Sequence, residues 1–278
     1  MSQNKTKFIF FGTPTVASET LEILKQEGFL PSLVVTSIDK PVGRKMILTP
    51  PPVKIWAEAN NIPVLQPEKI DNKFFDEIIK TETDLYLVVA FGKILPEKLI
   101  NYPKFGTINI HYSLLPKYRG ASPVESALLA GDNKTGVSIQ KMVFKLDSGP
   151  IIAKQVLAID INDNKESLRK KLVKIGGQLF LDILLDYMDN KIELQNQDES
   201  DATYCHKIKK EDGEISLNGN YLENYNKYRA FYGWPGIFFF KEINGKKTRF
   251  KITKARLENN KFIIEKVIPE GKKEIDYK

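Results

Sequence analysis

With 278 residues, of which 42% are apolar and 28% charged, the chain has the composition of a soluble globular protein and enough length for two domains. One cysteine excludes an internal disulfide, and two histidines beside it are too few for an ordinary Cys/His zinc site, so we expect no bound metal. The net charge of +7 arises in residues 205–278, which hold 17 basic and 10 acidic residues, whereas residues 1–204 hold 25 of each. A basic C-terminal region indicates a polyanionic partner, although a solvated lysine-rich surface would give the same count.

The first half of the chain alternates strands and helices. We expect strands over residues 7–11, 33–37, 62–65, 85–90 and 106–110, and helices over residues 14–26, 52–60, 72–81, 96–101 and 123–130. The strand at 85–90 is apolar throughout, as in parallel strands that are covered on both faces. This rhythm predicts an α/β domain with a parallel sheet of Rossmann type.

The second half changes in character. Residues 137–143 and 151–159 are expected to add a hairpin-like pair of strands, and residues 165–188 a long helix with one apolar stripe. Residues 189–201 have the polar composition of a linker. A helical segment at 221–231 and short strands at 237–242, 248–254 and 262–267 predict a small β-barrel. We therefore expect a catalytic domain over residues 1–188, a linker over 189–206 and a second domain over 207–278.

Short apolar runs and one turn limit the compartment and the cofactor. The run at residues 8–11 is too short for a signal-peptide core, and the run at 85–91 is too short for a membrane span. We expect a cytoplasmic monomer that does not contact a membrane. Residues 11–14 (FGTP) lack the spaced glycines of a dinucleotide fingerprint and the Gly-Lys ending of a phosphate loop, so they predict a tight strand-to-helix turn instead.

Asn109, His111 and Asp147 are the candidate catalytic residues. Asn109 and His111 are two residues apart on an expected strand, so both side chains lie on one face and can hydrogen-bond to one carbonyl oxygen of a substrate. A carboxylate from another loop, Asp147, can hold the imidazole in its charged form and manage the proton. Taken alone, an Asn-x-His pattern is more often a satisfied polar pair at a strand end.

The residues around these three resemble the folate-dependent formyltransferases, in residues 111–123 (HYSLLPKYRGASP) and 146–149 (LDSG). Three further segments narrow the resemblance to the branch that formylates the methionine on initiator tRNA: residues 11–14 (FGTP), 39–45 with 49–54 (DKPVGRK and TPPPVK), and 234–236 (WPG). The resemblance implies formyl transfer from 10-formyltetrahydrofolate to the α-amine of initiator Met-tRNA. It also implies that the second domain is an oligonucleotide-binding-like barrel, which is abbreviated here, as in a shortened chain or a compact variant.

The resemblance assigns the reduced folate to the loop after the Asn-x-His strand. Its residues are Ser113, Leu114, Leu115 and Pro116, and a Leu-Leu-Pro turn can offer a pterin a flat apolar surface and backbone hydrogen bonds. The carboxyl end of the neighbouring strand would line the same crevice, since ligands of open α/β sheets bind there. Its residues are Val89, Ala90, Phe91 and Gly92.

Two basic segments are expected to meet the tRNA. Residues 39–54 form an unusually long connection that carries Lys40, Arg44 and Lys45, and the resembling enzymes use this loop against the acceptor stem. In the basic tail, the candidates for phosphate contacts are Lys246, Lys247 and Arg249. A solvated surface remains the alternative for both segments.

Several alternatives stay open. Tyr112 stands where the family commonly has glycine, so its ring either narrows the pocket or points away from it, and Ser148 replaces a usual threonine. Rival functions are formyl transfer to an amino-sugar nucleotide, hydrolysis of the formylated folate, and RNA binding on a decayed enzyme scaffold. The intact set of Asn109, His111 and Asp147 argues against decay.

Overall fold

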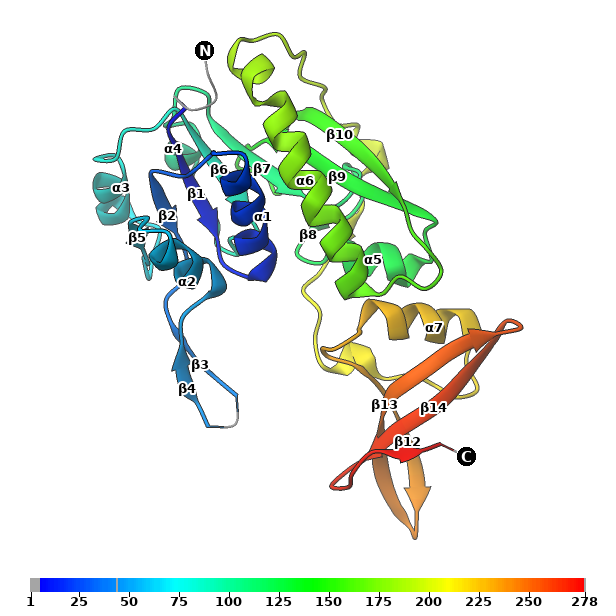
Figure 1. Cartoon of the computed structure of the whole chain (residues 1–278). Helices are drawn as coiled ribbons and strands as arrows, with labels where there is room; N and C mark the ends of the chain where they lie inside the picture. Colours follow the sequence, from blue (N-terminus) through cyan, green and yellow to red (C-terminus); the bar gives the residue numbers. More distant parts are fainter. Residues whose placement is uncertain (1–5, 44, 278) are drawn as a thin grey trace. The chain divides into compact units, whose positions relative to one another are not determined.

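The structure is a computed structural model that describes residues 6–43 and 45–277. It divides into two compact units (Figure 1). The first unit comprises residues 1–119, 136–156 and 170–203, and the second comprises residues 120–135, 157–169 and 204–278. Residues 120–135 and 157–169 were expected in the catalytic domain, so the units are built from segments far apart in the sequence. The domain limits expected from composition remain a prediction.

The first unit is organised around a mostly parallel sheet, as the strand–helix rhythm predicted. Its order is β10-β9-β7-β6-β1-β2-β5. Neighbouring strands from β5 to β7 are parallel, and β9 runs antiparallel to β7. The strands are β1 (Phe8–Gly12), β2 (Leu33–Val35), β5 (Val64–Leu65), β6 (Leu85–Val89), β7 (Thr107–His111), β9 (Lys134–Lys141) and β10 (Ile151–Ala158).

Apolar side chains on both faces of the sheet hold the helices against it. The helices of this unit are α1 (Thr15–Gln26), α2 (Pro52–Ala59), α3 (Asn72–Ile78), α4 (Glu97–Ile100) and most of α6 (Lys165–Met188), whereas α5 (Pro123–Ala130) belongs to the second unit. On one face, Ile9 and Phe11 of β1 belong to a buried cluster with residues of α3 and α4. On the other face, Phe8 stacks on Phe29, which packs against Phe180 of α6. β1 is therefore buried on both sides, and every residue of β6 is buried as well, which explains the continuous apolar runs of these two strands.

Gly12 makes the turn from β1 to α1 possible. A β-carbon at this position would lie 2.7 Å from the β-carbon of Ala17 and 2.9 Å from the carbonyl oxygen of Val89. No larger residue fits without moving the helix or the neighbouring strand. The expectation of a tight strand-to-helix turn is confirmed.

The long connection over residues 39–54 is a β-hairpin rather than an irregular loop. Strands β3 (Lys40–Val42) and β4 (Ile47–Thr49) pair antiparallel, and every described residue of both strands is exposed (Figure 1). At its base, Asp39 accepts hydrogen bonds from Lys54 and Gln66. The base is thus fixed to the body of the unit while the strands themselves stand in solvent.

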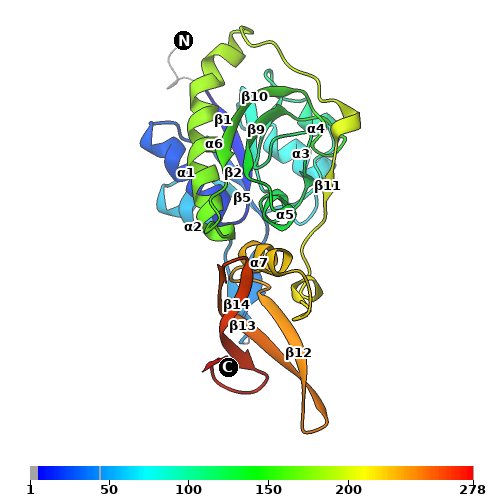
Figure 2. The ribbon, with the colours of Figure 1, turned by 90° about the vertical axis from the view of Figure 1, so that its right-hand side faces the viewer.

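The second unit contains a helix and an antiparallel sheet. Helix α7 (Tyr221–Ala230) precedes strands that lie in the order β12-β13-β14-β15, with β12 and β15 at the two ends of that order. The strands are β12 (Ile237–Ile243), β13 (Lys246–Glu258), β14 (Lys261–Pro269) and β15 (Ile275–Asp276). Arg229 of α7 is buried and donates to the backbone carbonyls of Asp160 and Asp163, which join this unit from the segment before α6. The three strands are confirmed in position, but β13 is longer than expected, with 13 residues, and the strands form an antiparallel sheet that Figure 2 shows from a second side.

Aromatic side chains of α7 pack within the second unit. Tyr225, Tyr228 and Tyr232 follow one another at ring-centroid distances of 6.2 and 6.5 Å, and Tyr228 also lies 6.4 Å from Phe262 of β14. Tyr225 is buried, whereas Tyr232, which follows α7, is 38% exposed, so these rings form a core at one end of the row only.

Candidate active site

Asn109 and His111 lie side by side at the carboxyl edge of the sheet. They occupy β7, where Asn109 pairs with Val88 of β6, and both side chains are buried, with 8% and 6% of their surface exposed. β2 lies on one side of β1 and β6 lies on the other, so the strand order reverses between β1 and β6. Open α/β sheets bind ligands at the carboxyl edge near such a reversal.

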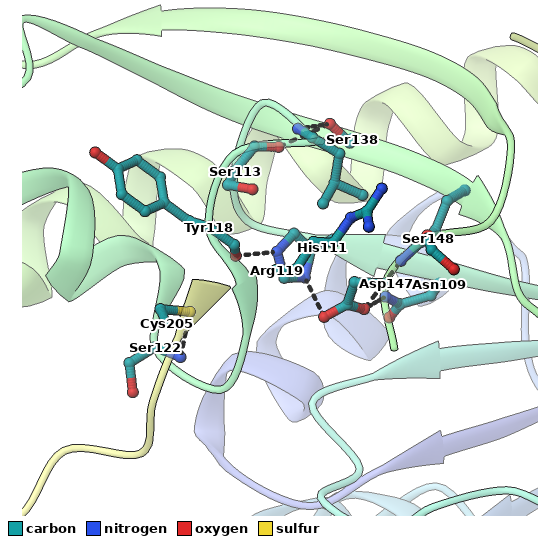
Figure 3. A network of polar contacts seen from close by, with 12 residues as sticks. Asn109, His111, Ser113, Tyr118, Arg119, Ser122, Ser138, Asp147, Ser148 and Cys205 are labelled. Atoms are coloured by element: carbon teal, nitrogen blue, oxygen red, sulfur yellow. Dashed lines mark hydrogen bonds and ion pairs between the residues drawn. The ribbon is translucent and has the colours of Figure 1, made fainter. Parts of the chain in front are cut away.

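The ring of His111 is held from both sides. Its Nε2 lies 2.9 Å from the backbone oxygen of Tyr118, and because a carbonyl can only accept, Nε2 carries the hydrogen. Its Nδ1 lies 3.8 Å from Oδ2 of Asp147, within ion-pair range but beyond a hydrogen bond (Figure 3). A protonated ring would present one N–H to the carbonyl and the other toward the carboxylate. Because the distance from Nδ1 to Oδ2 exceeds that of a hydrogen bond, Nδ1 remains able to hydrogen-bond to a substrate atom.

Amide groups surround the other oxygen of Asp147. Oδ1 accepts a hydrogen bond from Gln140 Nε2 at 3.0 Å and a longer one from Asn109 Nδ2 at 3.4 Å. The structure therefore brings the three predicted catalytic residues together, and it adds Gln140, which the sequence analysis missed. The missed signal was strand pairing, since Gln140 of β9 lies directly opposite Asn109 of β7.

The loop after β7 is fixed by hydrogen bonds within the protein. Ser138, opposite His111 in the β7–β9 pairing, donates to the oxygen of Ser113 at 2.7 Å and accepts from the nitrogen of Leu115 at 3.0 Å. Ser113 and Leu115 are buried, whereas Leu114 and Pro116 are partly exposed. Of the four residues expected to meet the folate, the latter two offer side-chain surface to a ligand.

The carboxyl end of β6 lies next to β7, the strand that precedes this loop. Val89 and Phe91 are buried, while Ala90 and Gly92 are exposed and have left-handed backbone angles, with φ of 48° and 77°. Thr13 of the β1–α1 turn donates to the oxygen of Phe91 at 3.2 Å.

Two cavities of about 220 Å³ lie away from Asn109, His111 and Asp147, one around α3 and α4 and one beside α7.

Tyr112 points away from the catalytic residues. It directly follows the last residue of β7, and its hydroxyl lies 3.1 Å from Thr20 of α1, on the face of the sheet away from Asn109 and His111. The phenol is 9% exposed and packs in the core. Of the two alternatives for Tyr112, a ring that narrows the pocket and a ring that points away from it, the second one is correct.

The cations expected to meet tRNA lie on two different elements. Lys40 and Lys45 are exposed on the β3–β4 hairpin, and Arg44 lies outside the described residues. Lys246, Lys247 and Arg249 are on β13 of the second unit, where Lys247 lies over Phe240 and Arg249 over Phe238, 4.3 and 5.5 Å from the ring centroids. Phe238 is buried and Phe240 is exposed, so only the second of these two rings offers surface to a partner.

Two absences hold for the described part of the chain. Within residues 6–43 and 45–277, no group of three or more His, Cys, Asp or Glu side chains is placed to hold a metal ion. In the same residues, no helix is both long and apolar enough to cross a membrane.

An Asn–His–Asp cluster at the carboxyl edge of a mixed α/β sheet can stabilise an oxyanion and move a proton, as acyl transfer requires, and comparison with known proteins identifies the family. The family described as formyl transferase matches residues 5–184, and its C-terminal domain matches residues 207–275. The chain belongs to the formyl transferase family.

Known relatives are similar over most of their length. A methionyl-tRNA formyltransferase of Staphylococcus epidermidis is 41% identical over 94% of this chain and 84% of its own. One from Caldicellulosiruptor saccharolyticus is 42% identical over 83% of this chain and 74% of its own. Among solved structures, an N-formyltransferase of Helicobacter canadensis in complex with folinic acid and dTDP-3-aminofucose has a TM-score of 0.67 at 23% identity, covering 91% of this chain and 88% of that one. The last likeness concerns the fold alone.

Proposed function

We propose that the protein transfers the formyl group of 10-formyltetrahydrofolate to the α-amine of methionine on initiator tRNA, a step in the initiation of protein synthesis. The observation that carries this proposal is the convergence of Asn109, His111 and Asp147 at the carboxyl edge of a formyl transferase sheet. The identity of more than 40% with two methionyl-tRNA formyltransferases supports the choice of acceptor. We expect the protein to work as a monomer in the cytoplasm.

In the proposed reaction the amine attacks the formyl carbon. A new C–N bond forms, the carbonyl oxygen becomes an oxyanion, and collapse of this intermediate breaks the bond to the folate nitrogen. The attacking amine loses one proton and the leaving nitrogen gains one, so the transfer is balanced. The amide of Asn109 and the protonated ring of His111 would donate to the oxyanion, and one such donor is typically worth about 2.7–4 kcal/mol. Asp147 would accept the proton of the attacking amine, directly or through water.

The geometry of His111 suits this role. Its Nε2 is anchored on Tyr118 at 2.9 Å, which fixes the plane of the ring before substrate arrives. The 3.8 Å between Nδ1 and Asp147 is beyond a hydrogen bond, so Nδ1 can donate to a substrate oxygen without breaking a hydrogen bond to the carboxylate. The carboxylate stays in place meanwhile, because Gln140 holds its other oxygen at 3.0 Å.

The reduced folate would bind beside this cluster. Leu114 and Pro116 offer partly exposed apolar surface for the pterin, and exposed backbone at Ala90 and Gly92 offers hydrogen-bonding groups. Ser113, Leu115, Val89 and Phe91 would support these positions from below, since all four are buried.

The tRNA would be met by cations of the hairpin and of β13. On the hairpin these are Lys40, Arg44 and Lys45, and on β13 they are Lys246, Lys247 and Arg249. Their contacts would be to phosphates, which position the RNA without reading its sequence. The rival acceptor, an amino-sugar nucleotide, is smaller and gives the hairpin and the basic strand no comparable role.

An acceptor comparison tests the proposal. The purified chain is given 10-formyltetrahydrofolate with methionyl-tRNA, with a dTDP-amino sugar, or with buffer alone, and formylated product and free formate are measured. We expect formyl-methionyl-tRNA as the main product. Preferential formylation of the amino sugar, or release of formate independent of any acceptor, would overturn the proposal.

A further inference from the structure

Gln197 binds the backbone of the loop that carries Asp147. It lies in the segment that has a linker's composition, yet it belongs to the first unit. Its Nε2 donates to the oxygen of Asp147 at 2.9 Å and to the oxygen of Gly149 at 2.7 Å. One side-chain amide therefore spans the Asp-Ser-Gly turn that follows Leu146.

Arg119 fixes the orientation of this amide. Its guanidinium is fully buried, and its Nε and Nη2 donate to Oε1 of Gln197 at 3.1 and 2.8 Å. Because a guanidinium can only donate, Oε1 must face Arg119, and Nε2 must then face the two carbonyls. The amide cannot flip without losing four hydrogen bonds.

Glu199 balances the charge of the buried arginine. Its carboxylate accepts from Nη1 and Nη2 of Arg119 at 3.1 and 2.9 Å, and Lys145 reaches the same carboxylate at 2.7 Å. Hydrogen bonds from Arg119 and then Lys145 lower the pKa of Glu199 to about 2. A series of hydrogen bonds thus connects Glu199 through Arg119 and Gln197 to the turn.

The turn needs such support because its backbone is unusual. Asp147 has a left-handed backbone angle, with φ of 46°, which costs a residue with a side chain conformational energy that its surroundings must offset. Gly149 is pressed against β9, where an added β-carbon would lie 1.9 Å from the oxygen of Lys141. The turn is therefore held between Lys141 on one side and Gln197 on the other.

We propose that Gln197, oriented by Arg119, is a positioning residue for formyl transfer: it holds the main chain of Asp147 so that the carboxylate faces His111. The inference rests on the proposed function, in which Asp147 takes part in catalysis. Gln197 does not reach the carboxylate itself, since its partners are backbone oxygens. Its contribution should appear in the chemical step and not in substrate binding.

The test replaces the amide while keeping its size. Gln197→Met removes the donor and the acceptor, and Gln197→Glu keeps an oxygen for Arg119 but sets a second oxygen against the two carbonyls. A small displacement of a catalytic group can cost up to roughly 100-fold in rate, so we expect both variants to lose kcat on that order with unchanged KM for folate and tRNA. The matched control is Gln195→Met, because Gln195 is exposed in the same segment and pairs with Ile151 through its backbone. The control should keep wild-type kcat.

A second background separates positioning from general loss of structure. In Asp147→Asn, which lacks the carboxylate, adding Gln197→Met should lower the single-turnover rate much less than it does in the wild type. An equal fractional loss in both backgrounds, or wild-type kcat in folded Gln197→Met and Gln197→Glu, would overturn the inference. Failure of the proposed function looks different, because the wild type itself would then formylate the amino sugar in preference to methionyl-tRNA or release formate without an acceptor.

Discussion

The cluster around Asp147 and the β3–β4 hairpin belong to the same unit but are built in opposite ways. Asn109 and His111 are more than 90% buried, and defined contacts connect His111 to Tyr118 and Gln140 to Asp147. On the hairpin, every described strand residue is exposed, including Val42, Ile47 and Leu48 with more than half of their surface in solvent. One region is organised before substrate binds, and the other offers charge and apolar surface to a partner.

This difference separates chemistry from recognition. Buried donors act in a low-dielectric site and lose little when solvent changes, so a single substitution there should remove most of the rate. Exposed cations act through screened interactions with many phosphates, and each contributes a modest, salt-dependent share. Variants of the two regions should therefore affect different kinetic constants.

The largest effect is expected at the catalytic cluster. His111→Ala and Asp147→Ala should each lower kcat by roughly 10²–10⁴-fold, the usual range for losing a general acid or base, with tRNA affinity unchanged. The double variant should cost much less than the product of the two, because the residues act as one unit. Steady-state kinetics with both substrates measures this. Near-normal turnover in His111→Ala would remove the histidine from the mechanism.

Next in size is the hairpin. Lys40→Gln with Lys45→Gln should raise the KM for methionyl-tRNA and leave kcat and folate binding unchanged, and Arg44→Ala should act in the same direction. The control is Lys25→Gln with Lys73→Gln, which removes the same charge from exposed helix positions of the first unit. Loss of folate binding in the hairpin variant would show that the hairpin serves the other substrate.

A smaller effect is expected on β13. Phosphate contacts release counterions, so Lys246→Gln, Lys247→Gln and Arg249→Gln together should reduce the slope of log K against log salt for tRNA binding by up to about three, one per contact. Lys272→Gln with Lys273→Gln changes exposed charges of the same unit and serves as the control. If the triple variant keeps the wild-type slope, these residues are a solvated surface.

The smallest effect concerns acid stability. The pKa of Glu199 is lowered from 4.5 to about 2, chiefly by Arg119, so its ionised form stabilises the folded state above the ordinary glutamate pKa, and that contribution is lost as pH falls toward 2. Glu199→Gln should therefore lower Tm at pH 7 and approach the wild type as pH is lowered through 4. The exposed Glu193→Gln should show no such convergence. A Tm difference that does not depend on pH would contradict the assignment.

Regular periodicity made most of the fold predictable. The helices over residues 123–130 and 165–188 were predicted with the bounds that the structure has, because their apolar spacing and flanking residues are clear. The placement of the Asn109 and His111 side chains on one face of the strand was predicted in the same way, from strand alternation. These features depend on neighbours in the sequence.

Features that depend on distant contacts were not predictable. The hairpin strands at residues 40–42 and 47–49 are exposed and contain a proline, so they lack the apolar alternation that identifies a strand. Gln140 and Gln197 were missed because their roles follow from a strand register and from the path of a polar segment beside Asp147. Composition alone assigned that segment to a linker, since it contains few apolar residues.

A single-turnover experiment tests the separation of chemistry from recognition most directly. With methionyl-tRNA and 10-formyltetrahydrofolate both saturating, formation of formyl-methionyl-tRNA is followed for the wild type, for Asp147→Asn and for Lys40→Gln with Lys45→Gln. The account predicts a chemical step slowed by orders of magnitude in Asp147→Asn and a wild-type rate in the lysine variant. A wild-type rate in Asp147→Asn, or an equally slow step in the lysine variant, would contradict it.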